Sequence, residues 1–204
     1  MKSTSVFNPL AKQNLGKSVV DALLESPALP LSTATNFSGA GVYAIYYCGA
    51  FSSYKPLSAL NRKEPTYPIY VGKAIPKGGR KGTITDASLD STALSKRLLE
   101  HKGSIEVVDS LRIEDFIYRS LVVDDIWIAL GETLVIQRFQ PLWNQVVDGF
   151  GNHDPGGGRY GGMRPAWDEL HPGRPWAKKC RPPKLTRKQI LDDVKAYMAK
   201  FQSS

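Results

Sequence analysis

The sequence predicts one α+β domain built from three strands and four helices. A chain of 204 residues can bury one substantial core, but it is too short for two full domains. Along the chain, apolar residues recur either at the helical period of about 3.6 or at the strand period of two. The predicted order is helix, strand, strand, helix, strand, helix, loop and helix.

The first part of the chain predicts one helix and two strands. Residues 12–24 place apolar side chains at helical spacing and end at a proline-containing stretch, so this helix should cap the core. The runs 41–51 and 67–76 are short, β-branched and aromatic, as strands are. Residues 51–66 are too many and too polar for a tight hairpin, so they are predicted to be an insertion between the strands.

A Gly-rich, basic loop over 73–91 leads into the second predicted helix, which has Ser91 or Thr92 as its N-cap and ends at Gly103. One face of this helix carries Leu94, Leu98 and His101. Residues 116–123 alternate well enough to predict the third strand.

The last part of the chain predicts two helices separated by a long loop. Residues 126–139 are apolar nearly all round, so this helix should be buried, with Asp124 and Asp125 at its N-terminus. Residues 149–183 are dense in Gly, Pro, Arg and Trp and have little periodicity, which predicts an irregular loop. Residues 185–201 then form a final amphipathic helix.

Composition favours a polyanionic partner. Lys and Arg outnumber Asp and Glu by 27 to 19, which gives a net charge of +8 and a pI near 9.5. We find no apolar run long enough to span a membrane and no signal peptide at the N-terminus, so we expect no membrane association and a cytoplasmic location. Two cysteines without a CxxC motif indicate a reducing compartment.

Glu132 is the most informative single residue. It lies in the apolar helix predicted over 126–139, where an unpaired carboxylate would be costly to bury. Three interpretations stay open: a pair with Arg138 or Arg97, a narrow exposed stripe on the helix, or coordination of a hard cation such as Mg²⁺, which proteins often hold with one or two carboxylates.

Four further side chains indicate a functional site only when they are considered together. Arg97 and His101 are four residues apart, so they project from one helix face. Taken alone, Arg97 fits a solvated helix residue and His101 a partner of the helix C-terminal dipole. Tyr43 and Tyr70 alone fit ordinary aromatic strand residues, but two adjacent strands would bring both phenols to one face.

Together these residues resemble the GIY-YIG nuclease superfamily. Six elements occur in that family's order: GVY at 41–43, YVG at 70–72, Arg97, His101, Glu132 and PLWN at 141–144. The resemblance covers about 41–144, with residues 1–40 as an N-terminal helical cap and 145–204 as a basic DNA-contacting loop and helix. Both tripeptides have Val where the family name has Ile, and the long gap between the tyrosines indicates an insertion.

The resemblance implies a small three-stranded antiparallel sheet flanked by helices, and phosphodiester hydrolysis with Mg²⁺ or Mn²⁺. It also implies a role for each residue: Tyr43 activates or positions the attacking water, Tyr70 aligns water and phosphate, Arg97 neutralises the phosphate, His101 assists proton transfer, Glu132 binds the metal, Asn144 orients the site, and Lys73 contacts the phosphate or Tyr43. A phenol titrates near 10, so holding Tyr43 as phenolate at pH 7 costs roughly 4 kcal/mol. Tyr43 should therefore need help from Arg97, Lys73, His101 or the metal.

Among the superfamily's classes, the chain most resembles the small type II restriction endonucleases, because its extra residues are basic insertions rather than separate domains. This implies double-strand cleavage of DNA by a homodimer, at a palindrome that we expect to be GC-rich, and a separate protecting methyltransferase. The alternatives are a homing or repair nuclease of this superfamily, or a non-catalytic DNA-binding module on the same fold. The presence of every expected catalytic residue type disfavours the last.

Residues 151–188 contain nine Lys or Arg and three acidic residues, interleaved with aromatic side chains, as in a DNA-contacting loop. The predicted DNA contacts are Lys77, Arg80, Lys81, Arg159, Arg164, Arg174, Lys178, Lys179 and Arg181. The four arginines between 159 and 181 are candidates to read guanine, and contact with phosphates alone is equally open for each. His153 in GNHDP has no second metal ligand nearby in the sequence, so we interpret that segment as a turn rather than an HNH-type metal site.

Overall fold

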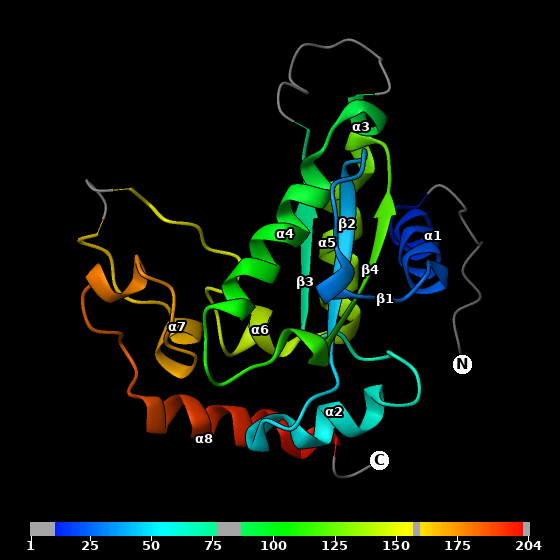
Figure 1. Cartoon of the computed structure of the whole chain (residues 1–204). Helices are drawn as coiled ribbons and strands as arrows, with labels where there is room; N and C mark the ends of the chain where they lie inside the picture. The colour runs from blue at the N-terminus through cyan, green and yellow to red at the C-terminus, as the bar shows by residue number, and fades with distance from the viewer. Residues whose placement is uncertain (1–10, 77–86, 157–159, 202–204) are drawn as a thin grey trace.

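The computed structural model describes residues 11–76, 87–156 and 160–201, which form a four-stranded antiparallel sheet between helices (Figure 1). The strands are β1 (Leu29–Pro30), β2 (Gly41–Tyr47), β3 (Tyr70–Ala74) and β4 (Phe116–Val122), in the spatial order β1-β4-β2-β3. The α+β class is confirmed. The extra strand, β1, has only two residues, so it carries no alternation that the sequence could reveal, and its proline is tolerated because β1 is an edge strand.

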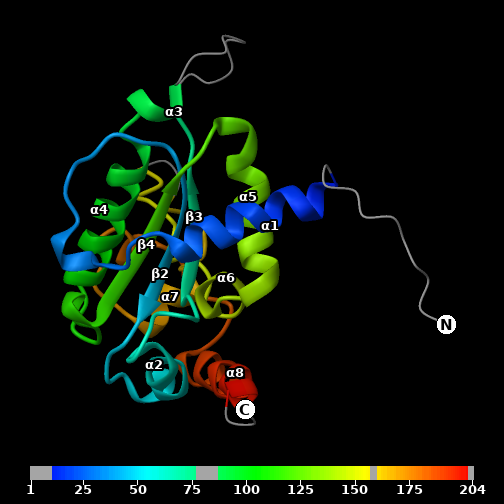
Figure 2. The same cartoon turned by 90° about the vertical axis from the view of Figure 1, so that its right-hand side faces the viewer.

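Both faces of the sheet are covered. α1 (Lys12–Glu25) and α5 (Asp125–Phe139) pack on one face, and α4 (Ala93–Glu106) packs on the other (Figures 1 and 2). Every residue of β2 is therefore buried, and successive side chains alternate between the two cores. The α4 side receives Tyr43, Ile45 and Tyr47, and the α5 side receives Val42, Ala44 and Tyr46.

The predicted insertion 51–66 is more ordered than a loop. It contains α2 (Lys55–Asn61), and it buries Tyr54 and Leu57 in the core. α8 (Arg187–Met198) lies beside it across the end of the sheet, and a Thr186–Gln189 capping box starts α8 near its predicted position (Figures 1 and 2).

The predicted irregular loop over 149–183 also contains regular structure, because its tryptophans supply apolar surface to bury. α7 (Ala166–Leu170) and a 3₁₀ turn (Ala177–Lys179) form there, and Trp167 is fully buried. The remaining short helices are α3 (Ala87–Asp90) and α6 (Leu142–Gln145).

Two helix predictions need correction. α4 runs through Gly103 to Glu106, because Gly103 faces open space and packing of Ile105 keeps the helix going. α5 is not buried all round: Ile126 is 68% exposed, since only α1 and the sheet cover this helix. Within the described ranges, no helix combines the length and the apolar character that crossing a membrane requires.

Candidate active site

Strand pairing brings the two phenols together at the β2–β3 boundary. Tyr43 pairs with Gly72, and Tyr70 lies two residues before Gly72 on the same face of β3. The ring centroids of Tyr43 and Tyr70 are 6.3 Å apart. A side chain at Gly72 would collide with the phenol, because an added Cβ would lie 2.4 Å from the Tyr43 hydroxyl. The glycine of the YVG motif thus makes room for the tyrosine of the GVY motif.

His101 reaches the same point from α4. Its Nε2 lies 2.7 Å from the Tyr43 hydroxyl, and its ring stacks on Phe150 with centroids 4.4 Å apart. Burial, together with Arg97, lowers the pKa of His101 well below its usual range. Burial and Tyr70 raise the pKa of Tyr43, while Arg97 lowers it. At neutral pH a neutral phenol therefore faces a neutral imidazole, which can accept the phenolic proton.

Arg97, one turn earlier on α4, supplies the positive charge at this site. Its Nη2 donates to the Gly151 carbonyl oxygen at 3.0 Å, and its Nη1 lies 3.0 Å from the Glu100 carboxylate and also contacts the His153 ring. Gly151 also crowds Tyr70, because an added Cβ would lie 2.4 Å from its hydroxyl. The segment after α6 thus closes the site over Arg97 and Tyr70.

Glu132 pairs with Lys73, and neither Arg138 nor Arg97 is its partner. Lys73 Nζ lies 2.6 Å from Glu132 Oε2, whereas Arg138 pairs with Asp21. Lys73 follows Gly72, so the alternation of β3 places it on the face opposite the phenols. This explains why Lys73 contacts Glu132 on α5 instead of Tyr43.

The Glu132 environment fits a hydrated Mg²⁺ better than a closed metal cage. Its side chain is 19% exposed at the edge formed by β3. Its charge acts on Tyr70: burial raises the pKa of Tyr70, Arg97 lowers it, and Glu132 raises it. In the part of the chain that the structure describes, no group of three or more His, Cys, Asp or Glu side chains gathers as a metal site. A lone carboxylate suits Mg²⁺, which keeps several of its waters.

Asn144 supports the edge strand. Its Oδ1 accepts from the Val71 amide and its Nδ2 donates to the Val71 carbonyl, both at 2.9 Å. The side chain thus pairs with the free edge of β3 as a neighbouring strand would, and it holds Tyr70 and Gly72 in place. Asn144 acts on the site through β3.

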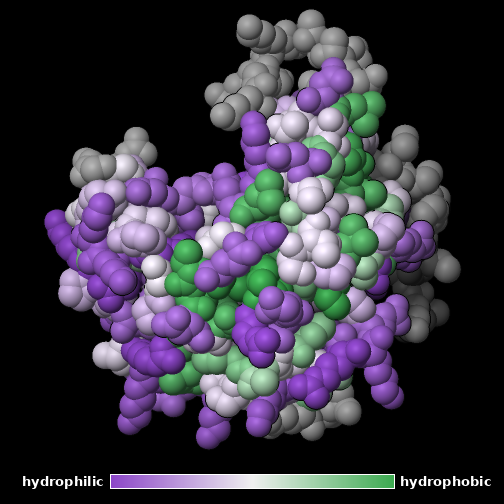
Figure 3. Space-filling model, in the orientation of Figure 1, coloured by the Kyte–Doolittle hydropathy of each residue, from purple (hydrophilic) through white to green (hydrophobic). Residues whose placement is uncertain are grey.

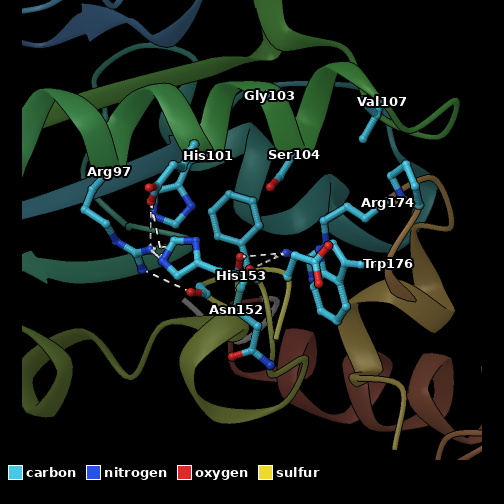
Figure 4. A pocket seen from close by; sticks show the side chains of 14 residues that line it. Arg97, His101, Gly103, Ser104, Val107, Asn152, His153, Arg174 and Trp176 are labelled. Atoms are coloured by element: carbon cyan, nitrogen blue, oxygen red, sulfur yellow. Dashed lines mark hydrogen bonds and ion pairs between the residues drawn. The ribbon is translucent and has the colours of Figure 1, made fainter. Parts of the chain in front are cut away.

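Two cavities meet at Arg97. One, of about 250 Å³, lies between α4 and residues 150–154 and 174–176; the other, of about 810 Å³, lies between the end of β3 and the N-terminal part of α4. Arg97, Glu100 and His153 line both. Figure 4 shows Arg97, His101 and His153 converging at one end of the smaller cavity, with Arg174 and Trp176 at the other. In Figure 3, hydrophilic and hydrophobic side chains both lie on the surface between α4 and α7.

A comparison with protein-family models decides the family. The model described as the Eco29kI GIY-YIG domain matches residues 35–198, which contain all six motif elements. The chain belongs to the Eco29kI GIY-YIG family. The family is one of GIY-YIG type II restriction endonucleases, and membership confirms the resemblance drawn from the motifs. No curated protein matches the chain.

In this Eco29kI-type domain, the placement of one arginine, Arg174, contradicts the prediction that it contacts DNA. Arg174 is 3% exposed, pairs with Asp168 through both carboxylate oxygens, and lies between the rings of Trp167 and Trp176. It also donates to the carbonyl oxygens of Gly149, Phe150 and Asn152. With its donors engaged, Arg174 shapes the segment that covers Arg97 and is not available to a base.

The other predicted DNA contacts differ in their placement. Arg164 is partly buried and bonds to Glu169 and the Ala177 carbonyl. Lys178, Lys179 and Arg181 are exposed. Lys77, Arg80, Lys81 and Arg159 lie outside the described residues.

The residues that close the site were not predicted from sequence. Phe150, Gly151 and His153 lie in a glycine-rich segment without periodicity, and their contacts with His101, Tyr70 and Arg97 join positions about 50 to 80 residues apart. The GNHDP segment, which we interpreted as a turn, places His153 directly against Arg97. The segment GFGNH was the available signal in the sequence for these residues, but its glycine content is that of an ordinary loop.

Arg174→Met is expected to lower the free energy of unfolding by about 3–5 kcal/mol, because Asp168 would keep a buried charge without a partner. Arg164→Met is the matched control: its pair with Glu169 is 30% and 23% exposed, so the expected loss is under about 1 kcal/mol. Urea unfolding at pH 7 measures both. Equal losses in the two variants would contradict this role for Arg174.

Acidification from pH 7 to pH 5 should lower the free energy of unfolding by about 2 kcal/mol for each buried histidine. Burial lowers the pKa of His171 to about 3, and the pKa of His101 also lies well below its usual range. In the unfolded chain the histidines have a pKa near 6.5, so they bind protons at a pH at which the buried histidines of the folded chain stay neutral. The free energy of unfolding therefore falls between about pH 6.5 and 3. Urea midpoints at the two pH values test this, and equal midpoints would contradict it.

Proposed function

We propose that this protein is a type II restriction endonuclease that makes sequence-specific double-strand breaks in DNA by Mg²⁺-dependent phosphodiester hydrolysis. The observation that carries the proposal is the 2.7 Å contact between buried Tyr43 and His101, beside Arg97, which lines both cavities. Hydrolysis of a phosphodiester needs a proton acceptor for water and positive charge at the phosphate, and these three residues supply both.

In the mechanism we propose, Arg97 binds the scissile phosphate and Tyr43 takes a proton from the attacking water. Burial makes a stable phenolate at Tyr43 more costly than the roughly 4 kcal/mol of a free phenol at pH 7, so Tyr43 should pass its own proton to His101 in the same step. Arg97 is the charged group that most lowers the pKa of His101. A phosphate anion bound to Arg97 offsets that effect and makes His101 a better acceptor when substrate is present.

Glu132 would hold the Mg²⁺ at the edge of β3, and Lys73, its present partner, would then be released toward the phosphate backbone. When bound, Mg²⁺ supplies charge stabilisation to the phosphoryl oxygens, and Mn²⁺ should replace it. Tyr70 would align water and phosphate. The charges of Arg97 and Glu132 both act on its hydroxyl.

We further propose that two copies bind one duplex. One active site per chain can cut both strands of a palindrome if a twofold axis relates the copies, and we expect a GC-rich palindrome. Exposed Lys178, Lys179 and Arg181 are the described cations we assign to the DNA, in a cytoplasmic protein whose host carries a protecting methyltransferase. Sedimentation with a cleavable duplex should give two chains per duplex. One chain per duplex, with both strands cut in one binding event, would overturn the dimer.

Incubation of purified protein with unmethylated phage DNA tests the function. We expect discrete fragments with Mg²⁺ or Mn²⁺ and none with EDTA. A smear would instead indicate a nuclease without strict specificity, and intact DNA that the protein nevertheless binds would indicate a non-catalytic DNA-binding module. One or very few cuts in a large genome would favour the homing class.

A further inference from the structure

His153 occupies a special place in this site. Among the described residues it is one of three that line both cavities, and its ring lies against the Arg97 guanidinium (Figure 4). Its side chain is 55% exposed, whereas His101 is 2% exposed. The two imidazoles near Arg97 therefore differ in exposure: His101 is buried, and His153 is open to solvent.

Phosphoryl transfer places the attacking and leaving oxygens on opposite sides of the phosphorus. If Arg97 holds the phosphate, Tyr43 and His101 lie on the buried side, where the water's proton is removed. The leaving sugar oxygen then departs toward the solvent side, where His153 lies. An alkoxide is a poor leaving group unless it gains a proton as the bond breaks, and a positioned acid typically contributes 10²–10⁴-fold in rate.

Two of the described groups at this site, His101 and Arg97 itself, are poorly suited to give that proton. His101 is neutral and faces the Tyr43 hydroxyl, and Arg97 stays protonated. The His153 imidazole, in contrast, is exposed, and its ring nitrogens can both take up and give a proton. Glu100 Oε2 lies 3.5 Å from His153 Nε2, so its charge can stabilise the protonated ring beside Arg97.

We infer that His153 is the general acid of the reaction and gives its proton to the leaving sugar oxygen. The inference rests on the proposed hydrolytic function. The water oxygen forms its bond to phosphorus while its proton passes to Tyr43 and on to His101. The bond from phosphorus to the sugar oxygen breaks, the oxygen takes the His153 proton, and His153 regains a proton from solvent.

The test compares two substrates. Once product end groups show which bridging oxygen leaves, a duplex is made with sulfur at that position, because a thiol titrates near 8.5 and leaves without help from an acid. His153→Gln should cut the normal duplex ~100-fold more slowly than wild type. The same variant should cut the sulfur duplex at nearly the wild-type rate. Glu132→Gln, as the control, should be slow on both substrates, and the exposed His153 position should leave the melting temperature unchanged.

Each result decides the matter. The acid role is supported if the wild-type protein cuts the normal duplex and His153→Gln is slow on the normal duplex but not on the sulfur duplex. A His153→Gln variant that cuts the normal duplex at the wild-type rate, or is equally slow on both substrates, overturns it while the hydrolytic function stands. A wild-type protein that does not cut DNA overturns the hydrolytic function itself, and the acid role with it.

Discussion

Replacing Glu132 by glutamine is expected to slow Mg²⁺-dependent cleavage by about 100-fold or more while specific DNA binding survives. The amide keeps the shape of the side chain but loses the charge that holds the cation, and metal assistance to such a reaction amounts to several kcal/mol. Single-turnover cleavage over a range of Mg²⁺ concentrations, with binding measured in Ca²⁺ or EDTA, separates the two effects.

Glu169→Gln is the matched control for Glu132→Gln. Glu169 is also a partly buried carboxylate in an ion pair, with 23% of its side chain exposed against 19% for Glu132, but it lies on α7 and pairs with Arg164. It should keep full activity. If Glu132→Gln cuts at near the wild-type rate, the metal assignment is wrong and Asp124, Asp125 and Asp148 become the candidates.

Tyr43→Phe is expected to lower the single-turnover rate by about 10²–10⁴-fold, the usual contribution of proton transfer. The variant removes the hydroxyl that faces His101 and almost no volume. It also leaves a buried imidazole nitrogen without that partner, so the free energy of unfolding should fall by about 1–3 kcal/mol.

Tyr54→Phe separates these two consequences. The Tyr54 hydroxyl lies 2.7 Å from His171 Nε2, the same distance as in the Tyr43–His101 pair, and it also accepts a hydrogen bond from Trp143 Nε1 at 3.1 Å. Its partner His171 lines neither cavity at Arg97, whereas His101 lines one of them. Its loss should cost at least as much stability as Tyr43→Phe, because two buried groups lose a partner, with little change in rate. A Tyr43→Phe protein that is less stable but cuts normally would reduce Tyr43 to a core residue.

Local sequence signals predicted the parts of this fold that depend on short-range regularity. Strand β2 and helix α8 follow from the spacing of their apolar residues, and the GVY and YVG motifs predicted two adjacent strands. Because the motif positions sit on regular elements, the structure brings Tyr43, Tyr70, Arg97 and His101 together as those elements pack.

What the sequence could not predict depends on contacts between distant segments. Lys73 meets Glu132 only because the sheet edge and α5 pack together, whereas charge alone suggested Arg138 or Arg97 as the partner. Arg174 has the composition of a DNA contact, yet two tryptophans and Asp168 enclose it. In the sequence, an arginine of an exposed basic loop cannot be told from a buried arginine. The difference lies in the carbonyl groups that surround the guanidinium in the fold.

The most direct test of one-step hydrolysis at the Tyr43–His101 site is the stereochemistry at phosphorus. A duplex with a phosphorothioate of known configuration at the cleaved bond is cut in H₂¹⁸O, and the configuration of the product is determined. If Tyr43 only removes a proton from water, a single displacement occurs and the configuration inverts. Retention would require two displacements through a covalent enzyme–DNA intermediate and would contradict the role of Tyr43 as proton acceptor.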